Sequence, residues 1–187
     1  MAGSSLDNEL LGQAERLRQQ AEQLVAQLLS CFDNDMSPTV VGSVAMDLMT
    51  KRDIDIACCI QPLEAARLLE VGQRITAKLP VGRLTYVNPS VVPWHDYKKG
   101  LFCGLQLQAA SGETWNSDVW AYDRQDFESA LAEHELLARR LREIDRWTLL
   151  RLKCSCAVQS HIIYTAVLEH GVRTVEELAD YVRNHEG

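Results

Sequence analysis

The stretch TVVGSVAMDLMTKRDIDI, residues 39–56, decides the fold of this chain. An apolar segment runs into Gly42-Ser43, and nine residues later Asp53 and Asp55 alternate with isoleucines at the start of a second apolar run, 53–60. Side chains two apart in a strand point to the same side, so we expect the two carboxylates to project together. Two adjacent like charges are unfavourable unless something positive lies between them. A divalent cation that prefers oxygen ligands is the usual partner of such a pair.

The segment between the two halves of this pattern has room for a turn and a short helix. The second strand can then return antiparallel beside the first, which brings Gly42-Ser43 next to Asp53 and Asp55. Glycine lets the backbone turn sharply and approach a ligand closely. The N–H groups after Gly42 and the Ser43 hydroxyl offer donors for phosphate oxygens, and the carboxylates offer ligands for magnesium that bridges those phosphates.

A third carboxylate, Asp118, lies in the segment NSDVW, residues 116–120. If this strand lies beside the 53–60 strand, Asp118 faces Asp53 and Asp55 across the ladder. Three carboxylates from two neighbouring strands can hold two metal ions, which together stabilise the attacking and leaving oxygens of a phosphoryl displacement. The alternative for these acids is a half-exposed strand that shows its charges to water.

The order of these features resembles the nucleotidyltransferase superfamily of DNA polymerase beta, in particular its small bacterial members. The resemblance covers residues 36–123 and implies transfer of a nucleoside monophosphate from a nucleoside triphosphate such as ATP to a hydroxyl acceptor, with pyrophosphate leaving. It implies that Asp53, Asp55 and Asp118 ligate two Mg²⁺ ions, with Mn²⁺ as an alternative, and that Asp118 also helps to activate the acceptor hydroxyl. It further implies that Gly42 and Ser43 bind the triphosphate.

Two residues depart from the pattern of this family. Asp47 stands at or near a position that often holds glycine, and Arg52 precedes the paired acids, where serine is frequent. An extra acid near a triphosphate repels it, and Arg52 either offsets that charge or binds phosphate itself. A solvated charge is the alternative for Arg52. The five histidines show no ligand spacing, so no role is assigned to them.

Composition narrows the class of protein. The 187 residues carry a net charge of −7, which disfavours a long nucleic-acid partner and favours a compact acceptor, a small molecule or a protein. No apolar run approaches the roughly 18 residues that a membrane span needs. Residues 1–7 lack the basic start and apolar core of a signal peptide. Six cysteines without a C-x-x-C pair are typical of a reduced protein, and we expect a cytoplasmic one.

The hydrophobic periodicity predicts an α+β fold, a small mixed β-sheet of the nucleotidyltransferase type flanked by helices. We expect residues 1–123 to form the nucleotidyltransferase-like core with an N-terminal helix, and residues 124–187 to form a C-terminal helical subdomain. The apolar stripe of the first helix either packs on its own domain or forms a dimerising seam, so a homodimer stays open. Predicted strands are 39–42, 53–60, 82–87, 101–109 and 115–122, and predicted helices are 5–31, 62–79, 126–142, 145–167 and 174–185.

Two functions are open at this point. The first is a magnesium-dependent nucleotidyltransferase that acts on a small molecule or on a protein or RNA hydroxyl. The second is a catalytically weak or inactive nucleotidyltransferase-like module that binds nucleotide or protein, such as a component of a toxin–antitoxin pair. Asp47 and the long N-terminal helix slightly favour the second.

Overall fold

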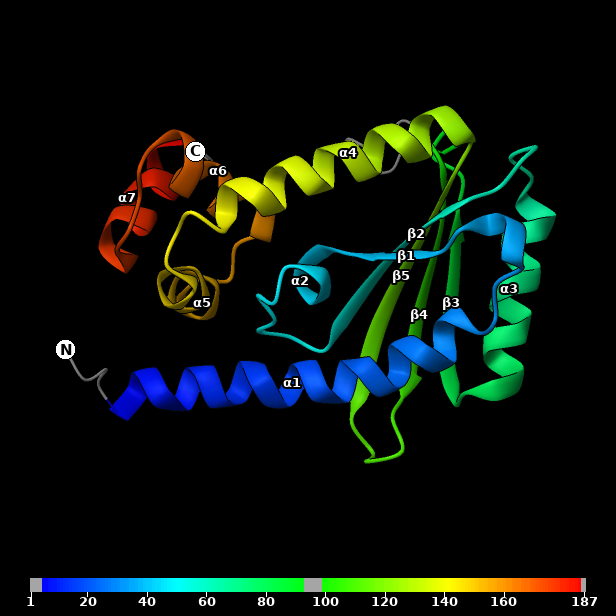
Figure 1. Cartoon of the computed structure of the whole chain (residues 1–187), viewed down its shortest axis with the longest axis horizontal. Coiled ribbons are helices and arrows are strands. Elements are labelled where there is room, and N and C mark those ends of the chain that lie inside the picture. The colour runs from blue at the N-terminus through cyan, green and yellow to red at the C-terminus, as the bar shows by residue number, and fades with distance from the viewer. Residues whose placement is uncertain (1–4, 93–98, 186–187) are drawn as a thin grey trace.

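A computed structural model describes residues 5–92 and 99–185 as a five-stranded sheet with helices packed around it (Figure 1). The arrangement is the predicted α+β fold, with a mixed sheet, an N-terminal helix and helices at the C-terminal end. The strands are β1 (Thr39–Val41), β2 (Asp53–Cys59), β3 (Val81–Val87), β4 (Leu101–Gln108) and β5 (Thr114–Tyr122). The helices are α1 (Ser5–Leu29), the 3₁₀ turn η1 (Asn34–Met36), α2 (Gly42–Ala45), α3 (Ala65–Lys78), α4 (Arg124–Leu141), α5 (Arg146–Ser155), α6 (Ser160–Glu169) and α7 (Val175–His185).

The strand order β1-β2-β5-β4-β3 brings β2 and β5 together at the centre of the sheet. β1 pairs antiparallel with β2, as the spacing of the Gly-Ser and Asp-Ile-Asp halves predicts. β4 and β5 form an antiparallel hairpin whose turn holds Gly112 at φ +94°, a conformation that favours glycine. β2 and β5 run parallel, with Asp55 directly opposite Asp118. The predicted neighbourhood of the two acidic strands is therefore confirmed.

The two faces of β2 meet different surroundings. Ile54 and Ile56 are fully buried in the core between the sheet, α1 and α3. On the opposite face, Ala57 and Cys59 are buried against Phe127 of α4. Asp53 and Asp55 share that face but lie before the stretch that Phe127 covers, and both are half-buried. The acids therefore occupy the part of the strand whose second face is left open.

α1 takes part in two hydrophobic clusters. Its stripe of Leu17, Ala21, Leu24 and Leu28 belongs to the sheet core, whereas Ala14 is buried among the residues of α5, α6 and α7. Figure 1 shows the helix crossing the lower part of the sheet, with its N-terminal half extending to the side where these C-terminal helices lie. The apolar stripe is thus buried within its own chain, which is the packing alternative for this helix.

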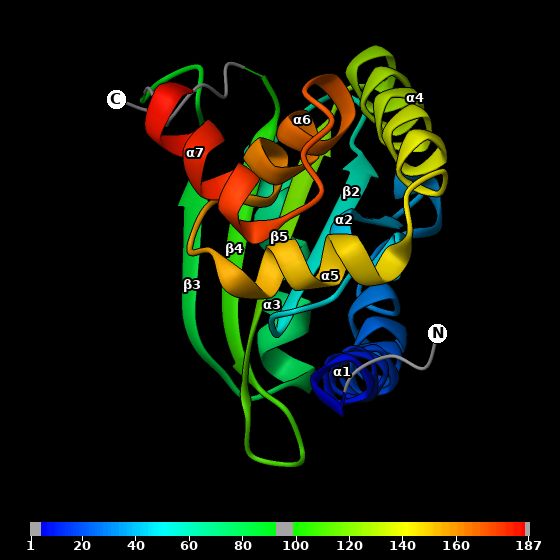
Figure 2. The same ribbon diagram turned by 90° about the vertical axis from the view of Figure 1, so that its left-hand side faces the viewer.

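The C-terminal helices differ from prediction at one point. The segment predicted as one helix over 145–167 is two helices, α5 and α6, because the turn at residues 156–159 lets α6 fold back and bury Ile163 and Tyr164 in the helical cluster. Figure 2 shows α5, α6 and α7 stacked in front of one end of the sheet. The last helix begins with a capping box: the Glu177 N–H donates to Thr174 Oγ1 (3.2 Å) and the Thr174 N–H donates to Glu177 Oε2 (3.0 Å).

Within the described ranges, none of the helices combines the length and apolar character that a membrane crossing requires. All six cysteines lie in these ranges as free thiols, and Cys31, Cys58, Cys59 and Cys103 are buried.

Candidate active site

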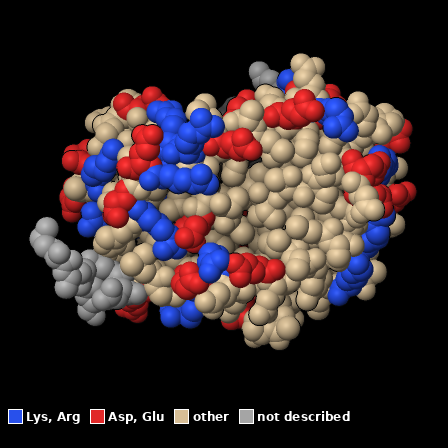
Figure 3. Space-filling model, in the orientation of Figure 1, with Lys and Arg blue, Asp and Glu red and all other residues tan. Residues whose placement is uncertain are grey.

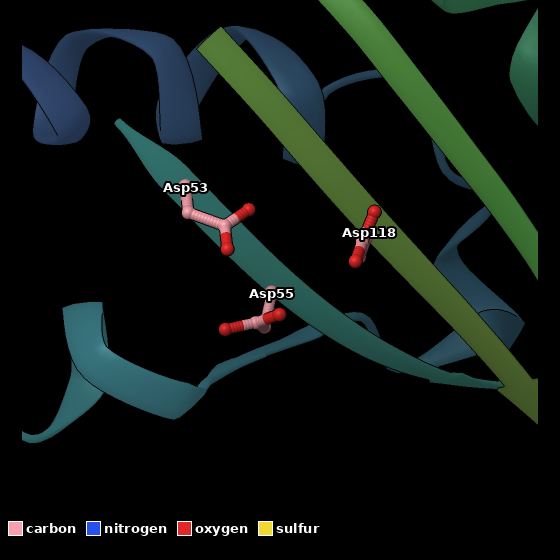
Figure 4. A group of neighbouring side chains, drawn as sticks. All are labelled: Asp53, Asp55 and Asp118. Carbon is pink, nitrogen blue, oxygen red and sulfur yellow. The ribbon is translucent and has the colours of Figure 1, made fainter. Parts of the chain in front are cut away.

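Asp53 and Asp55 of β2 and Asp118 of β5 converge on one face of the sheet (Figure 4). Each offers one carboxylate oxygen, and these three oxygens lie within 4.8 Å of one another. The alternation of β2 turns both of its acids to the same side, and the parallel register sets Asp118 beside Asp55. The acidic cluster predicted from the sequence is therefore present in the fold.

The acids lie in surroundings that penalise their negative charge. Burial raises the pKa of Asp55 to about 7, and repulsion from Asp53 and Asp118 adds to this effect. Burial, with repulsion from Asp53, raises the pKa of Asp118 to about 6. Burial also raises the pKa of Asp53, against the attraction of Lys51 and Lys153. Bound cations would remove this penalty, because they favour the ionised form of all three carboxylates.

One oxygen of the cluster lacks a hydrogen-bond partner among the described residues. Asp53 Oδ1 is buried, and none of the described residues forms a hydrogen bond with it. A buried carboxylate oxygen without a partner is costly, and a divalent cation satisfies it directly. Three carboxylates are also the hard oxygen ligands that Mg²⁺ and Mn²⁺ prefer. The donor set therefore fits a divalent metal centre.

Gly42 lies directly against this cluster. Gly42 has φ +65°, and a methyl group on its Cα would overlap the carboxylate of Asp55. The Gly42 N–H donates to Nε2 of His134 on α4 over 2.9 Å. Glycine is required here for two reasons, the left-handed backbone and the close approach to Asp55.

The other two residues predicted to bind phosphate, Ser43 and Arg52, lie in different surroundings from each other. Ser43 follows Gly42 in the single turn of α2 and is half-exposed. Arg52 forms an ion pair with Glu113 of the β4–β5 turn at 3.6 Å, so its charge is directed to that turn. The sequence elements brought together are thus Gly42-Ser43 and the three acids, whereas Arg52 is engaged elsewhere.

The extra acid, Asp47, has its own counter-charge. Arg146 Nη2 donates to Asp47 Oδ1 over 3.0 Å, and Arg146 Nε lies 3.0 Å from Asp47 Oδ2. The departure from the expected glycine is therefore balanced by an arginine from α5, which weakens the repulsion that this acid would exert on a phosphate.

Two residues near the cluster were not predicted from the sequence. His134, which accepts the Gly42 N–H, shares the face of α4 that contains Leu131 and Ala138. Lys153 is only 7% exposed and donates to the Leu48 carbonyl (2.7 Å) and the Tyr164 hydroxyl (3.1 Å).

The position of Lys153 also affects its charge. Burial lowers the pKa of this lysine to about 8, although the negative charge of Asp55 opposes the shift. The available sequence signal was its spacing from Leu149 and Leu150, which puts the lysine on the buried face of α5.

Replacing Gly42 with alanine should destabilise the protein and disturb the acids. The left-handed conformation costs a non-glycine residue about 1–2 kcal/mol, and the methyl group also displaces Asp55. Gly171→Ala is the matched control, since Gly171 has φ +69° with no atom within 4 Å of an added methyl group. Thermal unfolding followed by circular dichroism should show the larger loss for Gly42→Ala. Equal losses for the two variants would contradict the close approach to Asp55.

The acids also predict how stability depends on pH without metal. The pKa of Asp55 is about 7 in the folded protein against the ordinary value of 3.8 for an aspartate in the unfolded chain, so its stabilising contribution is present below about pH 4 and lost as the pH rises through about 7. Asp55→Asn should therefore raise the melting temperature by several degrees at about pH 7.5 and change it little at about pH 4. Mg²⁺ or Mn²⁺ should raise the melting temperature of the unmodified protein at the higher pH. An Asp55→Asn effect of equal size at both pH values would refute this account.

Comparisons with known proteins support the fold. The sequence matches none of the protein-family profiles and none of the curated proteins searched. A solved structure of the Cid1 poly(U) polymerase with bound MgGTP matches 90% of this chain with a TM-score of 0.62 and 11% identity. A cytoplasmic RNA terminal U-transferase matches 87% of the chain with a TM-score of 0.54 and 12% identity.

A second Cid1 structure, described by its RNA terminal uridylyl transferase activity, matches 90% of the chain with a TM-score of 0.54 and 14% identity. The chain covers 56%, 54% and 50% of the lengths of these three structures, in the order given. At such low identity the likeness concerns the fold. The described residues therefore share the α+β fold of these transferase structures, which is the nucleotidyltransferase type of fold that the sequence predicts.

Proposed function

We propose that this protein is a metal-dependent nucleotidyltransferase that moves a nucleoside monophosphate from a nucleoside triphosphate to a hydroxyl acceptor and releases pyrophosphate. One observation carries the proposal: three carboxylates from the parallel strands β2 and β5 meet beside Gly42, the residue at which the chain leaves β1. Such a cluster with a partnerless buried oxygen is suited to divalent cations, and the fold is that of nucleotidyltransferases.

In this proposal the residues of the site have separate roles in metal binding, proton transfer and phosphate binding. Asp53 and Asp55 would hold the divalent cations, and Asp118 would hold one of them and accept the proton of the attacking hydroxyl. When bound, such cations would supply charge that neutralises the triphosphate and lowers the pKa of that hydroxyl. Because the Gly42 N–H is bonded to His134, Ser43 offers its own N–H and hydroxyl to the triphosphate. Arg52 reaches phosphate only if its ion pair with Glu113 opens.

The acceptor we favour is a compact hydroxyl compound or a protein side chain. The chain has a net charge of −7, and on the face shown in Figure 3 the Lys and Arg side chains are interspersed with Asp and Glu. A long nucleic acid is best bound by a continuous basic surface. Two of the similar structures are described by RNA terminal uridylyl transfer, so an RNA 3′ hydroxyl with UTP is the alternative acceptor and nucleotide to test in parallel.

Substitution of the acids tests the chemistry directly. Asp55→Asn and Asp118→Asn should each lower pyrophosphate release by roughly 100-fold or more, because each removes a metal ligand and a charge in the transition state. The assay follows pyrophosphate with each of ATP, GTP, CTP and UTP, with Mg²⁺ or Mn²⁺, and with small hydroxyl compounds, protein and RNA as acceptors. Asp35→Asn is the control, since Asp35 is exposed and pairs with Arg67 at η1.

The result also separates the enzyme from a binding module. Calorimetry that detects metal-dependent nucleotide binding, abolished by Asp53→Asn with Asp55→Asn, supports the metal centre even before an acceptor is found. Nucleotide binding that is indifferent to both substitutions, with no pyrophosphate released, would favour the inactive module.

A further inference from the structure

The acid that departs from the family pattern, Asp47, ends α2 in an unusual backbone conformation. Its φ is +56°, a left-handed value that L residues other than Asn and Asp seldom adopt. The Asp47 N–H donates to Val44 O (3.3 Å), and the Leu48 N–H donates to Ser43 O (2.9 Å). These two bonds form a Schellman motif, and its left-handed position usually holds glycine. Asp47 therefore occupies a glycine position and carries a carboxylate there.

That carboxylate is held by α5. The Arg146 guanidinium donates to both the Asp47 side chain (3.0 Å) and the Asp47 carbonyl (2.9 Å). Arg18 of α1 adds a weaker contact, with its Nε 3.9 Å from Asp47 Oδ1. A planar guanidinium that engages one residue at two points fixes its orientation as well as its charge. The pair thus joins the end of α2 to the C-terminal helices.

A second cation of α5 continues this attachment. Lys153 lies two helical turns after Arg146, on the same side of the helix, and donates to the carbonyl of Leu48, the residue after Asp47. Leu48 is itself buried in the cluster formed by α5, α6 and α7. Two successive carbonyls of the segment 46–52 are therefore bound to one helix, which restricts the movement of this segment.

The segment 46–52 joins the two halves of the candidate active site. Gly42-Ser43 precede it, and Asp53 and Asp55 follow it at the start of β2. Gly42 also lies against the Asp55 carboxylate. A shift of the segment therefore changes the position of the metal-binding acids relative to the Gly-Ser turn.

We propose that Asp47 and Arg146 are a positioning pair: by fixing the segment 46–52 to α5, they hold Gly42-Ser43 and the acids of β2 in the arrangement that binds divalent cations. The inference rests on the proposed function for its metal centre, and neither residue of the pair contacts the reacting atoms. The glycine-to-aspartate departure is then part of how this chain builds its site, since the aspartate tolerates the left-handed backbone and recruits the arginine.

Replacement of Asp47 by glycine separates the effect of its left-handed backbone from the effect of its carboxylate. Asp47→Gly keeps the left-handed backbone and removes only the carboxylate, so the melting temperature should stay the same or rise. Mn²⁺ affinity, measured by electron paramagnetic resonance, should nevertheless fall about tenfold, because the segment that leads to Asp53 and Asp55 is held less firmly; this is the lower end of the effect that loss of supporting contacts has on metal sites. Arg146→Gln, which also removes the bond to the Asp47 carbonyl, should produce at least the same loss, and the double variant should lose little more than Arg146→Gln alone. Asp47→Asn, which keeps an acceptor for Arg146, should retain most of the affinity.

Two controls make the outcome decisive. Arg140→Gln breaks an ion pair between α4 and α6, Arg140–Glu169 at 2.7 Å, and should leave Mn²⁺ affinity unchanged. Hydrogen exchange of the metal-free protein should be faster for residues 43–48 in Asp47→Gly than in the unmodified chain. Mn²⁺ affinity within twofold of the unmodified protein in both Asp47→Gly and Arg146→Gln would overturn the positioning role. If the unmodified chain binds no Mn²⁺, the proposed function fails, and unchanged exchange would then show that the attachment fails as well.

Discussion

The parallel pairing of β2 with β5 is the constraint on which the rest of the site depends. It sets Asp118 opposite Asp55, and the alternation of β2 adds Asp53 on the same face. A shift of one residue in this register would turn the acids of β2 toward the position that Ile54 and Ile56 occupy in the core. The hydrophobic core therefore specifies the acidic cluster, because the burial of the isoleucines and the convergence of the carboxylates are the same structural fact seen from two faces.

Without a bound cation, the convergence of the three carboxylates lowers the stability of the folded protein. Asp53, Asp55 and Asp118 are partly removed from water and repel one another, and Asp53 Oδ1 lacks a partner among the described residues. Such a cluster opposes folding unless cations occupy it, so its presence is easier to explain by function than by stability. Lys153 supplies a nearby positive charge, but its ammonium group donates hydrogen bonds to the Leu48 carbonyl and the Tyr164 hydroxyl.

Local patterns were enough to predict the Asp53–Asp55 pair and the Gly-Ser turn, because each depends on residues close together in the sequence. The approach of Asp118 depended in addition on the expectation that its strand lies beside β2, which the parallel pairing of β2 with β5 bears out. The roles of His134 and Lys153 could not be predicted in this way, since their partners Gly42 and Leu48 are 92 and 105 residues distant. The break between α5 and α6 has neither proline nor glycine at residues 156–159, and it is decided by the packing of α6. Arg52 illustrates the same limit, because its partner Glu113 lies on a hairpin that only the sheet brings near.

Because α1 takes part in both hydrophobic clusters, its contacts cannot all form at the same stage of folding. The part of the helix that holds Leu17 and Leu28 finds its partners within the strands, whereas Ala14 meets α5 more than a hundred residues later. Contacts between such distant parts of a chain form slowly, because a long loop must close first. During synthesis on the ribosome, the sheet can therefore assemble while the start of α1 is still exposed. The C-terminal helices are synthesised last, so the hydrogen bonds of Arg146 and Lys153 that join the segment 46–52 to α5 can form only after the strands have left the ribosome.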